Sequence, residues 1–243
     1  MSVVPSVGGA RPETGTAEVA ARPRRHAAED VRRRQLIDAT IEAIAAVGFQ
    51  ATTLAEIAGR AGVSPGLVAF YFRDKNGLLE ATLRHLAMQL STSLIELQRQ
   101  ATTPRRRILA VVDATLGPTQ FDRRIASVWL AFWAQVPAVP RFARVQRIYA
   151  ARLLANLRAG FRAHPSLARL DGGEAARLAE ATAAMIDGAW LRATLSPEAG
   201  DGARARQLVG AFVEGRLALL DLALMHPSAT VAPNGAERGG FSM

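Results

Sequence analysis

The sequence predicts an all-α protein, and three observations carry this prediction. Apolar residues recur at spacings of three and four between residues 28 and 225, which is the period of an amphipathic helix. No segment alternates apolar and polar residues as a half-buried strand does. Prolines stand where the helical pattern breaks, and they are Pro104, Pro118, Pro137, Pro165 and Pro197.

The composition narrows the class of protein. The chain has 243 residues, 49% of them hydrophobic, which is too apolar for a disordered protein. It has no cysteine, so disulfides and thiolate metal sites are excluded. Neither a secretory signal nor a membrane-spanning apolar run is visible, so we expect a soluble, cytoplasmic protein without membrane association. The four histidines are scattered and no nucleophile or phosphate-loop motif occurs, so neither catalysis, metal nor cofactor is predicted.

The two ends of the chain differ from its middle. Residues 1–27 are rich in Pro, Gly, Ala and Thr, and we expect a flexible basic arm whose arginines either touch DNA or remain solvated. Residues 226–243 read as a flexible tail. Between them we expect two domains, residues 28–75 and residues 76–225. The net charge of +9 permits a nucleic-acid partner but is weak evidence, because arginine is abundant along the whole chain.

The first two helices have local start and stop signals. Ile37, Ile41 and Ile44 share one face of a helix that we expect to end at Gly48, where glycine supplies the left-handed cap and Phe49 folds back. Thr53 and Glu56 form a capping box that opens a second helix over residues 54–61. Gly62 ends it.

A third, short helix completes a helix-turn-helix pattern. Ser64 and Pro65 form an N-cap and first-turn pair, and the helix runs to about Tyr71. The second of two such helices can lie in the major groove of DNA. Ser64, Pro65 and Gly66 are small enough to let the backbone approach the DNA, although short core helices without a DNA role are the alternative. We assign Phe70 and Phe72 to the core.

The fourth helix is capped by Asp74 and carries an unfavourably placed cation. Lys75 lies in its first turn, where the helix dipole opposes a positive charge, so a bound phosphate would explain it. A solvated lysine is the alternative. The later helices are expected over residues 104–116, 120–136, 141–163, 174–195 and 203–224.

Aromatic residues and one acid suggest a ligand site in the C-terminal domain. Trp129 and Trp133 are one helical turn apart with Phe132 beside them, and Asp187 and Trp190 can likewise share one face. Aromatic rings with a nearby carboxylate suit a quaternary ammonium ion. Ordinary core packing is the alternative, and the spacing does not decide whether Tyr149 adds a fourth ring.

These residues resemble a known family. The segment TTLAEIAGRAGVSPGLVAFYFRDKNGLLEA resembles the DNA-binding domain of TetR-family repressors. The segments RRRQLIDATIEAI, VWLAFWA, ARLLANL and IDGAWLRATLS are similar to BetI-type members, which act in the choline–glycine betaine pathway. The likeness extends from about Arg32 to Ser196. It implies an N-terminal three-helix DNA-binding domain followed by a helical ligand-binding and dimerisation domain.

The resemblance also implies partners and roles. A homodimer would bind an inverted-repeat, double-stranded operator, with choline or betaine aldehyde as effector; a different hydrophobic or cationic ligand is the alternative. The last two helices would pair across the dimer axis, unless they pack only within one subunit. Ser64, Pro65 and Gly66 would face base edges, and Thr53, Tyr71 and Lys75 would contact phosphates. Phe70 stands where a His or Tyr is usual, so one polar contact would be lost.

Overall fold

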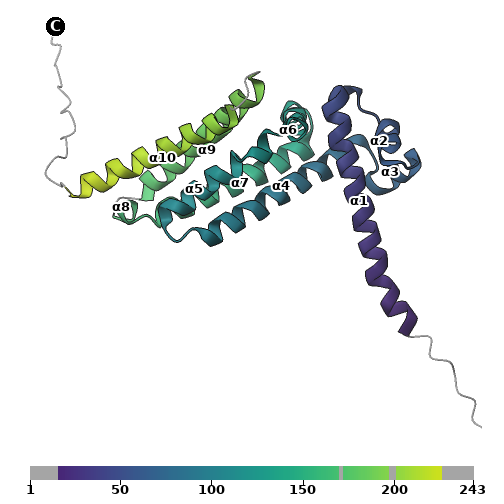
Figure 1. Ribbon diagram of the computed structural model, residues 1–243, viewed down its shortest axis with the longest axis horizontal. Helices are drawn as coiled ribbons and strands as arrows, with labels where there is room; N and C mark the ends of the chain where they lie inside the picture. The colour runs from purple at the N-terminus through teal and green to yellow at the C-terminus, as the bar shows by residue number, and fades with distance from the viewer. Residues whose placement is uncertain (1–15, 170–171, 197–200, 226–243) are drawn as a thin grey trace, which may run out of the picture. The chain divides into compact units, whose positions relative to one another are not determined.

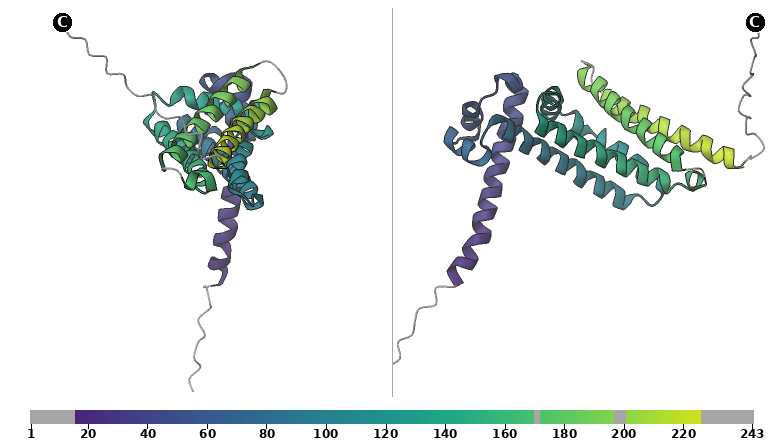
Figure 2. Two further views of the ribbon diagram at one scale, coloured as in Figure 1. Left: turned by 90° about the vertical axis from the view of Figure 1, so that its left-hand side faces the viewer. Right: turned by 180° about the vertical axis from the view of Figure 1, so that it is seen from behind.

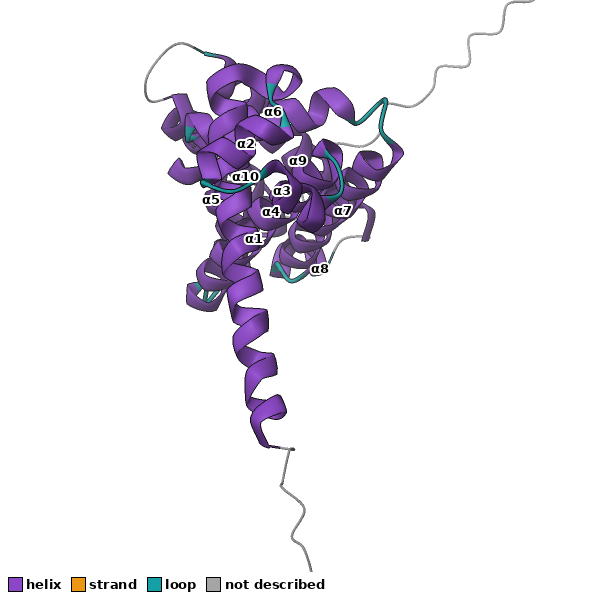
Figure 3. Ribbon diagram, turned by 90° about the vertical axis from the view of Figure 1, so that its right-hand side faces the viewer, coloured by secondary structure: helices purple, strands orange, loops and turns teal. Residues whose placement is uncertain are grey.

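The computed structural model describes residues 16–169, 172–196 and 201–225, and every regular element in these ranges is helical (Figures 1 and 3). The predicted all-α fold is confirmed. The elements are α1 (Thr16–Ala51), α2 (Leu54–Ala61), α3 (Pro65–Phe72), α4 (Lys75–Gln100), α5 (Pro104–Thr115), the 3₁₀ turn η1 (Pro118–Phe121), α6 (Arg123–Gln135), α7 (Pro140–Arg162), α8 (Pro165–Ala168), α9 (Gly172–Leu195) and α10 (Asp201–Met225).

The chain divides into two compact units, residues 1–82 and 83–243. The division falls between Thr82 and Leu83 inside α4, whereas the sequence predicts a boundary between residues 75 and 76, at the start of this helix. Among the described helices, none has a stretch both long and apolar enough to cross a membrane.

Helix α1 begins earlier than predicted. The structure continues it upstream to Thr16, so residues 16–27 of the expected flexible arm are helical, while residues 1–15 and the tail at 226–243 lie outside the described residues. Ala and Arg, frequent in this stretch, have high helix propensity, which the prediction underweighted. At its other end the helix is interrupted at the predicted glycine. Gly48 has φ +76°, and Phe49 folds into the core with 8% of its surface exposed.

The core of the first unit joins α1, α2, α3 and the start of α4. Apolar side chains from all four helices meet in one buried cluster, which contains Leu36, Ile37, Ala39, Ala43, Ile57, Ala58, Val68, Phe72 and Leu78. Burial of these side chains sets α2 and α3 against α1. The same packing determines which sides of α2 and α3 face the solvent.

The second unit is a bundle of long helices. Helix α7 packs against α5 and α9, and α10 packs against α9 and α5; α9 and α10 lie side by side in Figures 1 and 2. The approach of α7 to α5 depends on Gly160, because a Cβ atom there would lie 2.7 Å from Cγ1 of Ile108. Buried Leu157 and Phe161 flank this glycine.

Candidate DNA interface and candidate ligand cavity

Two helix caps build the helix-turn-helix. The Thr53 hydroxyl accepts a hydrogen bond from the backbone N–H of Glu56 at 3.1 Å, and the Ser64 hydroxyl accepts one from the N–H of Leu67 at 3.3 Å. Between them, Gly62 adopts φ +66° and ends α2. Each cap satisfies one N–H that has no partner inside its helix. The predicted starts of α2 and α3 are therefore confirmed.

The start of α3 is open to solvent. Ser64, Pro65 and Gly66 are exposed, and a Cβ atom at Gly66 would meet nothing within 4 Å. Glycine inside a helix costs about 1 kcal/mol relative to alanine, and here the fold does not require it. The missing side chain leaves the surface of α3 free for close approach by a partner. The DNA contacts of these three residues and of Thr53 remain predictions.

The two phenylalanines of α3 have opposite surroundings. Phe72 is 6% exposed and lies in the core, as predicted, whereas Phe70 is 78% exposed, so its assignment to the core is wrong. Successive helical residues are rotated by about 100°, so side chains two positions apart point to nearly opposite sides. Tyr71 lies between them in direction and is half-buried against the core cluster.

Lys75 has partners within its own unit. Its ammonium donates hydrogen bonds to the carbonyl oxygens of Phe49 at 2.7 Å, Thr52 at 3.0 Å and Gln50 at 3.2 Å, and it lies 4.4 Å from the centre of the Phe49 ring. The carbonyls of Phe49 and Gln50 belong to the C-terminal end of α1, where the helix dipole favours a cation, and Thr52 directly follows that helix. The structure thus explains a lysine in the first turn of α4 without a phosphate. A phosphate contact of Lys75 remains a prediction.

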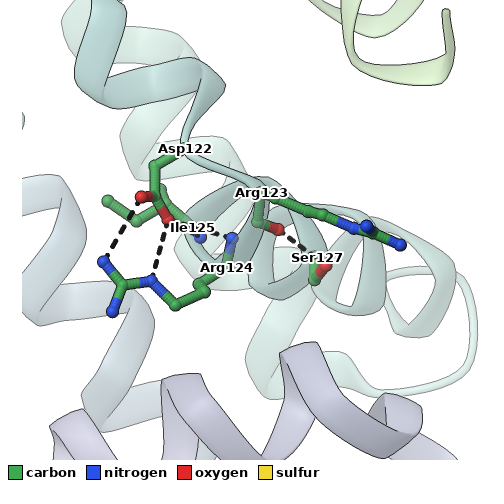
Figure 4. A network of polar contacts seen from close by, with 5 residues as sticks. All are labelled: Asp122, Arg123, Arg124, Ile125 and Ser127. Carbon is green, nitrogen blue, oxygen red and sulfur yellow. Dashed lines mark hydrogen bonds and ion pairs between the residues drawn. The ribbon is translucent and has the colours of Figure 1, made fainter. Parts of the chain in front are cut away.

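Helix α6 starts later than the sequence predicts. The Asp122 carboxylate accepts hydrogen bonds from the N–H groups of Arg124 at 2.9 Å and Ile125 at 3.3 Å, and it also pairs with the Arg124 guanidinium (Figure 4). The hydrogen bond from that side chain lowers the pKa of Asp122. This cap begins α6 at Arg123 and leaves residues 118–121 as a 3₁₀ turn, instead of one helix over 120–136.

Helix α6 carries two tryptophans into a small cavity. Side chains from five elements line it, and they are Thr115, Gln120, Trp129, Trp133, Tyr149, Ile186, Asp187 and Trp190. Trp133 and Trp190 meet edge to face with centroids 5.0 Å apart, and Trp129 and Tyr149 lie 5.3 Å apart. The structure therefore brings the three predicted tryptophans and Asp187 together and adds Tyr149 as a fourth ring.

Phe132 does not belong to this lining. It is fully buried, packs against Phe142 at 5.6 Å and Trp129 at 6.1 Å, and supports the cavity from behind. The structure places Phe132 in the core beside Trp129, and its part in ligand binding stays a prediction. Conversely, sequence reasoning missed Thr115, Gln120 and Ile186, since no local spacing connects these positions on separate elements.

The cavity is narrow and carries one acidic side chain. Its volume is about 20 Å³, room for about one water molecule. Among its lining residues Asp187 is the sole carboxylate, and burial raises the pKa of that group. Burial, and then the charge of Asp187, raise the pKa of Tyr149, so the phenol stays protonated. An ionised carboxylate among aromatic rings loses part of its hydration, which raises the free energy of the charged form. A bound cation would stabilise that charge.

The indole N–H groups differ. Trp190 Nε1 donates to the carbonyl oxygen of Gln120 at 3.0 Å, which fixes that ring against η1. Trp133 Nε1 is buried and has no hydrogen-bond partner among the residues that the structure describes. The cavity therefore offers rings, one carboxylate and the buried indole N–H of Trp133 as a donor. In the described ranges, no three His, Asp or Glu side chains gather in a way that could hold a metal ion.

Comparison with known proteins adds a family to this geometry. Residues 36–82 match bacterial regulatory proteins of the tetR family, and residues 104–218 match the C-terminal domain of BetI-type transcriptional repressors. The HTH-type transcriptional regulator BetI of Escherichia coli strain UMN026 is 44% identical over 193 residues, covering 78% of this chain and 95% of that protein. The same regulator of strain K12 is 42% identical over the same shares.

Solved structures share the fold. A transcriptional regulator from Pseudomonas aeruginosa PAO1 has a TM-score of 0.67 at 26% identity, over 78% of this chain and 92% of that one. A regulator from Saccharomonospora viridis, solved in complex with choline, has a TM-score of 0.67 at 21% identity, over 75% and 95%. The chain therefore belongs to the TetR family of DNA-binding transcriptional repressors, with a BetI-type C-terminal domain, and it is not an enzyme.

Proposed function

We propose that this repressor controls genes for converting choline to glycine betaine, and that choline or betaine aldehyde is its effector. The observation that carries the proposal is the cavity in which Trp129, Trp133, Tyr149 and Trp190 surround Asp187. We further propose that it acts in the cytoplasm as a homodimer on an inverted-repeat operator. A different hydrophobic or cationic effector is the alternative within the same family.

The cavity suits a quaternary ammonium ion for chemical reasons. Such an ion has no N–H to donate, so ring faces and a nearby anion are its main attractions. Each ring contributes roughly 0.5–2 kcal/mol to a cation removed from water. The unpartnered Trp133 N–H can donate to the hydroxyl of choline or the carbonyl of betaine aldehyde. The choline complex of the Saccharomonospora viridis regulator, similar in fold, supports this choice of ligand.

Ligand entry requires the rings to separate. The edge-to-face contact of Trp133 and Trp190 occupies the site, and these rings belong to α6 and α9. A cation inserted between them would therefore move α6 relative to α9. The ligand can change DNA binding only through its difference in affinity between the protein with the rings in contact and the protein with the rings apart. If the ligand weakens DNA binding by some factor, operator DNA must weaken ligand binding by the same factor.

A second copy of the chain would cover an apolar face of α9 and α10. Several leucines there are exposed by more than half, namely Leu195, Leu208, Leu219 and Leu222. Pairing these faces would bury them in a four-helix interface. Two α3 helices would then enter successive major grooves, roughly 34–36 Å apart, which requires an inverted repeat. A footprint over a single asymmetric half-site would contradict this.

The test of the effector is a comparison of charge at constant shape. Tryptophan fluorescence titration should give choline an affinity about ten- to a thousandfold above that of 3,3-dimethylbutanol, its uncharged carbon analogue. Trp133→Ala should shrink this preference, while Phe142→Leu, a core change outside the lining, should not. Equal binding of the two compounds would reject a cation site and favour the hydrophobic alternative.

A further inference from the structure

We propose that Phe70 determines operator specificity by packing on the 5-methyl group of a thymine in the major groove. The inference rests on DNA binding, which the family establishes, and is independent of the effector. It replaces the core role predicted for this residue with an assignment to a defined chemical group on the DNA.

The Phe70 side chain is exposed to solvent. Phe70 is 78% exposed, the highest value among the exposed large apolar side chains of the described residues. Its neighbours along α3, Val68 and Phe72, fill the core at 0% and 6% exposure, so the core of the first unit does not include the Phe70 ring. A single exposed apolar residue needs no explanation, but Phe70 stands on the DNA-binding helix beside exposed Pro65, Gly66 and Ala69, and such an apolar face marks a surface that a partner covers.

The exposed face of α3 is apolar. Pro65, Gly66, Ala69 and Phe70 are the exposed residues of α3, and none has a side chain able to form a hydrogen bond. Among the four bases, only thymine presents an apolar group, its 5-methyl, to the major groove. An apolar face with one protruding ring is therefore suited to thymine, and poorly suited to the polar edges of guanine and cytosine.

The Phe70 ring packs against Tyr71. Phe70 meets Tyr71 edge to face, with centroids 5.4 Å apart and planes at 86°. Tyr71 is in turn half-buried against the core cluster of the first unit. Phe70 therefore projects from a supported base, and a supported ring loses little conformational freedom when it meets DNA.

The experiment removes the methyl group and nothing else. A duplex is first selected from a random double-stranded library by the wild-type protein. Each thymine of its half-sites is then replaced in turn by deoxyuracil, which keeps the hydrogen-bonding edge. At one position the wild-type affinity should fall about fourfold per half-site, and about fifteenfold when both half-sites are changed, since one buried methyl group is worth about 0.8 kcal/mol.

Two variants test whether Phe70 is responsible. Phe70→Ala should weaken operator binding and bind thymine and deoxyuracil duplexes equally at that position. Phe70→Tyr, which keeps the ring, should retain the discrimination. Met88→Ala serves as a control, because Met88 is 60% exposed on α4 outside the first unit and should leave DNA binding unchanged.

Three results would overturn the proposal. The first is that the wild-type protein binds every deoxyuracil duplex as tightly as the selected thymine duplex. Phe70→Ala could retain the full deoxyuracil penalty, which would assign the methyl contact to another residue. It could also weaken operator and random-sequence DNA by one common factor, which would place the ring on the sugar–phosphate backbone. Unchanged thermal unfolding of Phe70→Ala, expected for an exposed residue, verifies that the variant is folded.

Discussion

Removal of the Lys75 ammonium should destabilise the DNA-binding unit. The ammonium ties α4 to the end of α1 through three carbonyl oxygens, those of Phe49, Gln50 and Thr52. Lys75→Met keeps an unbranched side chain and deletes the charged donor, which lies over the Phe49 ring. We therefore expect α1 to lose the group that closes its C-terminal end.

The magnitude follows from the contacts. A hydrogen bond to a charged group contributes about 1.5–3 kcal/mol net. The three bonds share one half-buried ammonium, and the freed carbonyls regain water, so their energies do not add in full. The close ring adds about 0.5–1 kcal/mol. We expect Lys75→Met to lower the free energy of unfolding by about 2–3 kcal/mol, a large share of the about 5–15 kcal/mol typical of a domain.

The assay separates this role from a phosphate contact. Chemical denaturation reports the loss of stability, and the salt dependence of operator binding reports phosphate contacts. If Lys75 met a phosphate in each half-site, its loss would reduce the salt slope by about two units in a dimer. Lys75→Arg is the matched control, because arginine replaces lysine well at a phosphate but poorly in a compact cluster of carbonyls.

One observation would refute the reasoning. If Lys75→Met unfolds like the wild type and has a reduced salt slope, the ammonium serves DNA and not the fold. Because Lys75 is the sole lysine of the sequence, ¹⁵N-lysine labelling gives one side-chain signal that reports on it directly. Slow exchange of that ammonium with water in the free protein would support the three carbonyl contacts; fast exchange would argue against them.

Three further predictions concern Asp187, the glycines Gly160 and Gly59, and the Ser64 cap. Burial raises the pKa of Asp187, so its charge costs stability as the pH rises through that pKa; Asp187→Asn should stabilise the ligand-free protein at neutral pH, with a gain that vanishes in acid, and should abolish the preference for choline over its neutral analogue. A destabilised Asn variant would contradict this. Gly160→Ala should lower the free energy of unfolding by about 1–3 kcal/mol, because the added methyl group pushes α7 away from Ile108. Gly59→Ala has open space at its Cβ and should raise the free energy of unfolding by up to about 1 kcal/mol; thermal unfolding measures both. Ser64→Ala should cost about 1 kcal/mol through the lost cap of α3, and unchanged denaturation would show that solvent replaces the cap.

The local features of this protein follow from short stretches of its sequence. The caps at Thr53 and Ser64 and the helix interruption at Gly48 were predictable, because each depends on residues within about four positions along the chain. The buried residues of α4, which are Leu78, Leu79, Thr82, Leu86 and Leu90, follow the spacing of three and four that marks one face of a helix in the sequence. The tryptophan and aspartate positions were predictable as candidates but not as one cavity.

The contact partners of these side chains depend on how the helices pack. Phe70 and Phe72 are identical in type and two positions apart, and the packing of α3 on α1 alone put one in water and the other in the core. Lys75 meets carbonyls 23 to 26 residues away, and Tyr149 joins the cavity from a separate helix. Local patterns specify where a helix begins and which face is apolar; contacts between helices depend on how those faces pack, and no short segment contains that information.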